Sequence, residues 1–193
     1  TNGRRLSDLN FVQDLIHAGT SKFIVPILGP CPTIHDNLTQ VNGSFKETTK
    51  GIRNTISVAG PDSILSNIVL TRQNHTYLKE MLELCIDLGI QSVLLTFVQP
   101  DGRAELNAES LIPRMTDVAN NINDAVREYG SHLSITVSEI PECIIPELGE
   151  IVRNQLYDPV LEIAKVDGYF VFNVLKMHIE EVNSEKITYP AVI

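Results

Sequence analysis

The sequence has little cysteine and a shortage of positive charge. Among its 193 residues are three cysteines, Cys31, Cys85 and Cys143, which lie far apart in the chain. An odd number of widely spaced cysteines fits neither a disulfide framework nor a zinc ribbon. We therefore expect a reducing environment and a cytoplasmic location.

The shortage of positive charge argues against nucleic acid as a partner. The chain holds 15 Lys and Arg against 24 Asp and Glu, a formal net charge of −9. Proteins that bind nucleic acid usually carry a basic stripe, whereas the densest basic cluster here is Arg4-Arg5. No run of about 18 consecutive apolar residues is present, so we expect no membrane-spanning segment and no membrane partner.

Two kinds of hydrophobic pattern alternate along the chain, as in an α/β protein. Short apolar runs predict strands, and apolar residues at helical spacing between them predict helices. Such an order is typical of parallel βα units. It favours a partial, incomplete TIM-like barrel of about five strands, with an open doubly wound sheet as the other choice. The strands are expected at 22–28, 67–71, 92–98, 133–140 and 169–174, and the helices at 7–19, 43–54, 75–90, 111–130 and, more weakly, 147–156.

We expect one main domain over residues 1–150. Residues 151–193 would form a C-terminal extension of helix and strand packed on the same domain. The run 92–98 is apolar throughout, which predicts a parallel strand buried on both sides.

Several residues predict where the helices begin. Ser7 is expected to be an N-cap. Ser44 and Glu47 have the spacing of a capping box. Pro113 suits the first turn of the long helix that follows the 92–98 strand.

An ordered series of motifs resembles the core of the radical S-adenosylmethionine (radical SAM) enzymes. The series is "TNG" (1–3), "GP" followed by "HDNLTQVNGSFKETTKGIRN" (29–54), "NIVLTRQN" (67–74), "FVQPDGRA" (97–104) and "SEIPECIIPE" (138–147). The resemblance implies a partial βα barrel in which TNG follows the third strand. This chain would then correspond to the later two thirds of such a core.

The resemblance also implies a cofactor and residues that contact it. S-adenosylmethionine (AdoMet) would be held by Asn2, Asn67, Thr71, Phe97, Gln99 and Pro100, and Glu139 would face the substrate. Pro26 and Leu28 stand where family members often have Ser and His, which removes polar contacts to the ribose from that strand. Each polar residue also has a plainer interpretation, because Asn favours turns and strand polar groups are often bonded to water.

The three cysteines do not imitate the family's cluster-binding loop. That loop has the spacing Cys-x3-Cys-x2-Cys, and a four-iron cluster needs thiolates that converge from a compact segment. The resemblance therefore places the 4Fe-4S cluster in the intact parent only. We expect this chain to be inactive alone, as a fragment or a degenerate member of the family. The substrate, a small molecule or a peptide, is left open.

Two other residue groups allow alternatives. Cys31, His35 and Asp36 form "CPTIHD", a spacing that suits a metal, but the resemblance makes His35-Asp36 a structural loop element that caps a turn. In "SEIPECIIP", either the Glu139 carboxylate lies at the mouth of the barrel and faces the substrate, or the segment is a strand exit between prolines in which Cys143 is a small buried hydrophobe. Cys85 is expected in the core.

Two competing functions belong to different classes. A shortened barrel without its cluster could be a non-catalytic interaction module, since an exposed sheet edge must pair or be covered. Such a module would form a homo-oligomer. An unrelated barrel enzyme could instead use Glu139 as a base, which requires a partner group within hydrogen-bond reach.

Overall fold

The structure is a computed structural model that describes residues 1–148, 160–166 and 169–176. The chain divides into two compact units, residues 1–155 and 156–193. Each unit is described by itself. The weak helix expected at 147–156 lies mostly outside the described residues, and so does the packing of the extension on the main domain.

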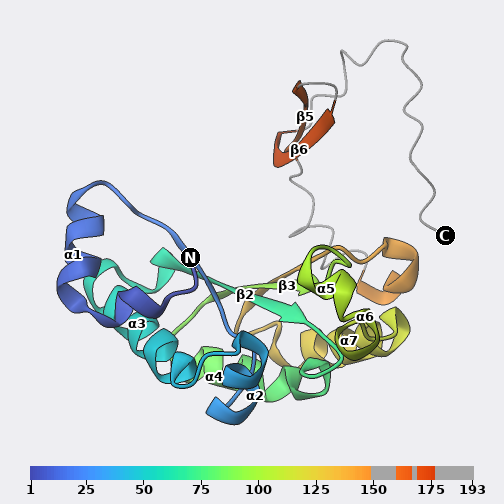
Figure 1. Cartoon of the computed structure of the whole chain (residues 1–193), viewed down its shortest axis with the longest axis horizontal. Helices are drawn as coiled ribbons and strands as arrows, with labels where there is room; N and C mark the ends of the chain where they lie inside the picture. The colour runs from blue at the N-terminus through green and yellow to red at the C-terminus, as the bar shows by residue number, and fades with distance from the viewer. Residues whose placement is uncertain (149–159, 167–168, 177–193) are drawn as a thin grey trace. The chain divides into compact units, whose positions relative to one another are not determined.

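The first unit is built on a parallel sheet of four strands in the order β1-β2-β3-β4 (Figure 1). All three strand pairs are parallel, as the alternating pattern predicted. The unit belongs to the α/β class. Its sheet is not closed and is compatible with a partial TIM-like barrel. The strands are β1 (Phe23–Pro26), β2 (Ile64–Leu70), β3 (Ser92–Phe97) and β4 (Ser134–Ser138).

Helices connect the strands on one side of this sheet. Figure 1 shows α3, α4 and α7 along the same side of β2 and β3. The helices are α1 (Leu9–His17), α2 (Pro32–Thr39), α3 (Ser44–Ala59), α4 (Leu78–Asp87), α5 (Arg103–Leu106), α6 (Ala108–Leu111) and α7 (Met115–Tyr129). Short 3-10 turns are η1 (Arg4–Ser7), η2 (Pro61–Ser63), η3 (His75–Tyr77), η4 (Glu142–Ile144) and η5 (Pro146–Leu148). No helix among the described residues is long and apolar enough to cross a membrane.

The two faces of the sheet differ in burial. On the closed face, toward the helices, every second side chain of β2, from Ile64 to Leu70, is buried. On the opposite face, here called the open face, side chains keep partial exposure. The open face consists of Ile24, Pro26, Leu65, Asn67, Val69, Ser92, Leu94, Thr96, Ser134, Thr136 and Ser138.

Burial of β3 on both sides was a wrong prediction. Its side chains alternate between intermediate and buried positions, so only one face is closed. The apolar run reflects Leu94 on the open face and Val93 and Leu95 in the core.

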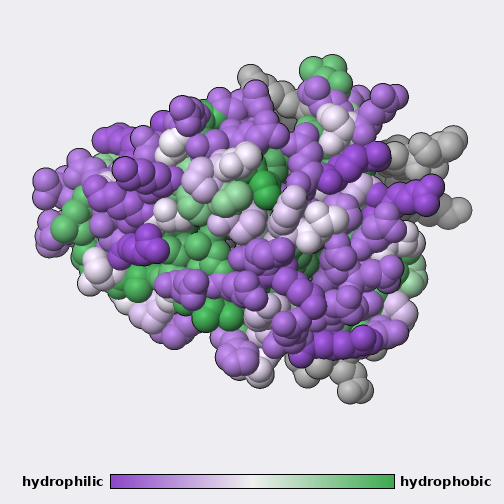
Figure 2. All heavy atoms as spheres, turned by 90° about the horizontal axis from the view of Figure 1, so that it is seen from below, coloured by the Kyte–Doolittle hydropathy of each residue, from purple (hydrophilic) through white to green (hydrophobic). Residues whose placement is uncertain are grey.

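Figure 2 shows the helix side of the molecule from below. That surface is largely hydrophilic, with apolar side chains between the polar ones, as expected for helices whose apolar faces turn to the core.

The expected fifth strand exists but does not extend the parallel sheet. It is β6 (Tyr169–Lys176), which pairs in antiparallel fashion with β5 (Val160–Val166) in a separate two-stranded sheet. A short chain between two apolar runs favours a hairpin, because a parallel crossover needs a dozen residues or more.

Three of the predicted helix starts were wrong. Asp8, not Ser7, caps α1, and its carboxylate accepts a hydrogen bond from the Asn10 N–H. Gly43 is the N-cap residue of α3, so Ser44 is already helical and no capping box forms. Pro113 lies before α7, which begins at Met115, because the long predicted helix is broken after α6.

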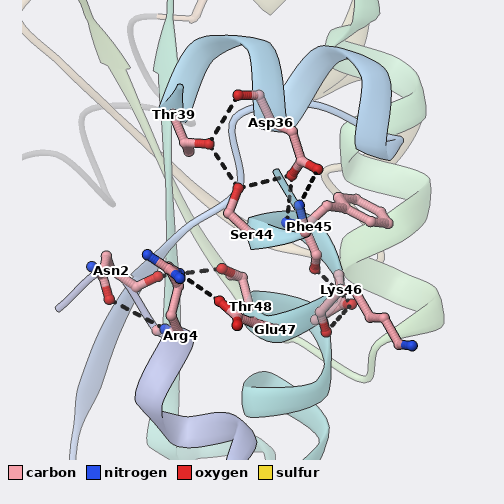
Figure 3. A network of polar contacts seen from close by, with 12 residues as sticks. Asn2, Arg4, Asp36, Thr39, Ser44, Phe45, Lys46, Glu47 and Thr48 are labelled. Carbon is pink, nitrogen blue, oxygen red and sulfur yellow. Dashed lines mark hydrogen bonds and ion pairs between the residues drawn. The ribbon is translucent and has the colours of Figure 1, made fainter. Parts of the chain in front are cut away.

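The residues His35 and Asp36 lie in helix α2 and not in a loop, which corrects one detail of the prediction (Figure 3). The carboxylate of Asp36 accepts hydrogen bonds from the backbone N–H groups of Gly43 and Phe45, both at 2.7 Å, and from the Ser44 hydroxyl at 2.8 Å. These bonds, that from Phe45 first, lower the pKa of Asp36. Its role is structural, since it satisfies free donors at the start of α3.

His35 makes the stability of this region depend on pH. Its side chain is 2% exposed, and Nδ1 accepts a hydrogen bond from the Leu28 N–H at 3.2 Å. Burial, opposed by the charge of Asp36, lowers its pKa below 6.5. The unfolded chain therefore binds this proton more readily, so the stabilisation is present above about pH 6.5 and is lost as the pH falls below it.

We expect His35→Asn to flatten this dependence, because Asn can still accept from Leu28 but does not titrate. The free energy of unfolding by urea is measured between pH 7.5 and 5. One proton contributes a slope of at most about 1.4 kcal/mol per pH unit. The exposed His132, replaced by Gln, is the matched control. An unchanged slope in His35→Asn would show that another group controls the acid sensitivity.

Candidate functional site

Polar side chains of three neighbouring strands meet on the open face. Asn67 is on β2, Thr96 on β3 and Ser138 on β4. The strand register places Thr96 opposite Ser138 and Asn67 opposite Leu94, one pleat away from Thr96. Since Thr96 and Ser138 end or nearly end their strands, the group lies toward the carboxyl ends. Ligands of parallel α/β proteins bind at that edge.

Hydrogen bonds join the three side chains in series. The Ser138 hydroxyl donates to Thr96 Oγ1 at 3.1 Å, and the Thr96 hydroxyl donates to Asn67 Oδ1 at 2.8 Å. Among the described residues, no group accepts from Nδ2 of Asn67. The group therefore offers two amide N–H donors to a ligand on the open face.

Gln99 and Glu139 form a second polar pair just beyond these strand ends. Gln99 Nε2 donates to Glu139 Oε2 at 3.0 Å, and both residues are exposed. Glu139 has φ 64°, a left-handed conformation that side chains other than Gly adopt at a cost of about 1–2 kcal/mol. Strained backbone of this kind collects at functional sites. The structure thus brings together Gln99, predicted as a cofactor contact, and Glu139, predicted to face the substrate.

Asn2 is held in a different environment. Its side chain oxygen accepts from the Arg4 N–H at 3.2 Å, and its backbone oxygen accepts from the Thr48 hydroxyl (Figure 3). It borders a hollow of about 400 Å³ lined by Asn2, Arg4, Arg5, Ser7, Asp8 and Glu47. The neighbouring Thr1 amino group donates to the Ile24 carbonyl, so the first residues run beside β1.

Thr71 and Phe97 do not turn free side chains to the open face. Thr71 is 6% exposed, and its hydroxyl donates to Asn74 Oδ1 at 3.0 Å within the loop after β2. Asn74 in turn donates to the Leu28 and Val69 carbonyls, which ties two strand ends together. Phe97 lies on the closed face and is 6% exposed, so only its backbone is available to a ligand on the open face. Pro100 is exposed.

Sequence reasoning missed Thr96 and Ser138. Both lie inside apolar runs that were interpreted as strands without further analysis. Strand residues two apart share a face, and this rule puts Thr96 with Leu94 and Ser138 with Thr136. A polar residue at the last open-face position of successive parallel strands was a usable signal.

The described cysteines do not fit an iron–sulfur cluster. Cys85 is 0% exposed on α4, and burial first, against a hydrogen bond to Ser66, raises the pKa of its thiol to about 12. It lies in the core, as expected. Cys31 is partly exposed and Cys143 is exposed. In residues 1–148 and the two strands that follow, no three Cys, His, Asp or Glu side chains gather as a metal site.

A separate hollow of about 600 Å³ lies between α2, the loop after β2 and α5–α6. The side chains that the structure describes in its lining are uncharged: Asn37, Leu38, Thr39, Gln40, Gln73, Leu106, Asn107, Ser110 and Leu111. Asn37 Nδ2 donates to Gln73 Oε1 across it at 3.3 Å. These described residues offer amide, hydroxyl and leucine side chains to a ligand.

Comparison with known proteins gives the arrangement a family context. The chain is 30% identical over 137 residues to the AdoMet-dependent heme synthase of Oleidesulfovibrio alaskensis, a radical SAM relative. The chain is related to the radical SAM enzymes. The aligned part covers 70% of this chain and 34% of the heme synthase, so the chain spans about a third of that relative's length. No protein-family model matches the chain.

The radical SAM relationship agrees with the open parallel sheet. Members of this family use AdoMet and a 4Fe-4S cluster. Of these two groups, the uncharged donors and acceptors of the open face suit part of AdoMet, whereas the described cysteines do not suit the cluster.

Proposed function

We propose that this chain is the later part of a radical SAM core and that its open face holds the adenosyl half of AdoMet. The single observation that carries the proposal is the series of hydrogen bonds from Ser138 through Thr96 to Asn67, which joins the carboxyl ends of β4 and β3 to the middle of β2. The kinship with a heme synthase that depends on AdoMet supports the identity of the ligand.

The chemistry of the open face favours the adenosyl half. All its side chains are uncharged, whether apolar or amide and hydroxyl. Ribose hydroxyls and purine nitrogens form hydrogen bonds with such groups, whereas the charged methionine half needs ionic partners. In this proposal Asn67 donates to the adenosyl group, and Gln99 and Pro100 border it. Asn2, Thr71 and Phe97 would contribute through backbone groups, because their side chains are engaged or buried elsewhere.

Bound AdoMet supplies radical chemistry when a reduced cluster cleaves it. The residues described here would bind and orient the cofactor, and Glu139, fixed by Gln99, would face the substrate. We infer that the cluster belongs to the intact parent. The chain would be a fragment or a degenerate member that lacks activity alone. We also place it in the cytoplasm, from its cysteine content.

Asn67→Ala tests this assignment. We expect AdoMet to bind the 193-residue chain and the variant to bind about tenfold more weakly, since one good hydrogen bond contributes about 1–1.5 kcal/mol. Titration calorimetry measures both affinities. Asn120→Ala, which removes an exposed amide from α7, is the matched control. Absence of heat with the unsubstituted chain would contradict the proposal.

A non-catalytic module is the second candidate. β1 and β4 are the edge strands of the parallel sheet in the described part of the chain. Edge strands that carry unpaired backbone groups favour association with another chain. This alternative predicts a homo-oligomer that does not recognise AdoMet.

A further inference from the structure

We propose that Thr96 and Ser138 are positioning residues that orient the Asn67 carboxamide, so that the open face selects a hydrogen-bond acceptor of the adenosyl group. This inference rests on the proposed function for the identity of the ligand. The orientation of Asn67 does not depend on it.

A free Asn side chain has two nearly equivalent orientations. Exchange of its oxygen and nitrogen changes the ligand group that it recognises. The Thr96 hydroxyl can donate or accept, so by itself it does not fix the orientation.

In the structure these hydrogen bonds run in one direction. The Ser138 hydroxyl donates to Thr96 Oγ1 at 3.1 Å, and the Thr96 hydroxyl donates onward to Asn67 Oδ1 at 2.8 Å. An Asn67 oxygen that accepts from Thr96 leaves Nδ2 to face the ligand. The series of hydrogen bonds therefore runs in one direction, from β4 through β3 to β2.

The backbone holds all three residues in place. Parallel register aligns Thr96 with both Val69 and Ser138. The buried neighbours Ile68, Leu95 and Val137 fix the three strands from the closed face. Side chains on rigid strands are positioned more accurately than those on loops, which is what a selective site needs.

The consequence is a specific ligand preference. Two N–H donors recognise a ribose hydroxyl oxygen or an unprotonated purine nitrogen, and both belong to adenosine. The methionine half of AdoMet should not depend on Thr96, because no charged group is part of the chain of hydrogen bonds.

Thr96→Val removes the hydroxyl but keeps the shape of the side chain. We expect a loss of about tenfold in affinity for AdoMet and for adenosine, and about threefold in Ser138→Ala, which only loosens the far end of the chain. Thr96→Ser should restore binding to within about twofold of the unsubstituted chain, because it keeps the hydroxyl. Thr116→Val, an exposed position of α7, is the control.

A spectroscopic readout separates orientation from general stability. In the ligand-free protein, NMR of the 15N-labelled chain should show the two side-chain amide protons of Asn67 at chemical shifts displaced from those of a solvated carboxamide. In Thr96→Val both signals should move toward the solvated values and exchange faster with water, and in Thr96→Ser they should not.

The outcomes are distinguishable. Asn67 amide signals that are the same in Thr96→Val and in the unsubstituted chain would overturn the positioning role, whether or not ligand binds. Equal affinities of the two proteins for AdoMet would overturn it as well. If the unsubstituted chain binds neither AdoMet nor adenosine while the Asn67 signals change as expected, the proposed function fails and the orientation stands. Binding of methionine that depends on Thr96 would refute the preference for adenosyl. If Thr96→Val does not fold, Thr96→Ser and Ser138→Ala supply the same comparisons.

Discussion

Gly51→Ala should destabilise the protein by about 3 kcal/mol, although Ala normally stabilises a helix relative to Gly by about 1 kcal/mol. Gly51 is buried in α3, where the helix meets η1. A Cβ atom there would lie 2.5 Å from the Gly3 carbonyl oxygen and 2.8 Å from Leu6 Cβ. The first is a backbone atom, so the conflict cannot be relieved by a side-chain rotation.

Thermal and urea unfolding measure this effect. A loss of about 3 kcal/mol corresponds to a fall in Tm of about 6–12 °C for a chain of this size. Lys50→Ala, an exposed substitution in the same helix, is the control and should change stability by less than about 0.5 kcal/mol. A Gly51→Ala protein as stable as the original would show that the TNG segment does not pack against α3 at this distance.

Asp36→Ala should lower the free energy of unfolding, and this is the second largest effect that we expect. The substitution leaves the N–H groups of Gly43 and Phe45 without their acceptor and also frees the Ser44 hydroxyl from its bond to the carboxylate. Thr39 Oγ1 lies 2.7 Å from Ser44 Oγ, so the hydroxyl keeps one partner in the variant. The loss should therefore fall on the start of α3.

Hydrogen exchange locates the effect as well as measuring it. Amide protons in the first turn of α3 should exchange faster in Asp36→Ala, while those of α7 should change only with global stability. Asp14→Ala, an exposed carboxylate on α1, is the control. Slow exchange at Phe45 in the variant would contradict the capping role.

The architecture could be predicted from the sequence because its signals are local and repeated. The segments around Val93 and Ile135 each predict a strand without help from the rest of the chain, and the helices between them require parallel pairing. The helix starts could not be predicted so well. Ser44 has good capping chemistry, yet Asp36 from the preceding helix takes that role across a tertiary contact.

The candidate site could be predicted only in part, for a related reason. Asn67 stands out as a polar residue in an apolar strand, and it does lie on the open face. Its partners Thr96 and Ser138 are distant in sequence and become neighbours only through strand register. The hydrogen bond from Thr71 to Asn74 forms in the loop after β2, and Phe97 occupies a buried position of β3, so neither side chain could be assigned before the strand ends were known.

The most direct test of the central claim is a chemical-shift map of AdoMet on the 15N-labelled chain. We predict that saturating AdoMet moves the signals of Asn67, of the end of β3 around Thr96 and of Ser138, with smaller changes at Gln99 and Glu139. Signals of buried helix residues such as Cys85 on α4 should stay in place. Shifts confined to the hollow near Leu106, or no shifts at saturating AdoMet, would contradict it.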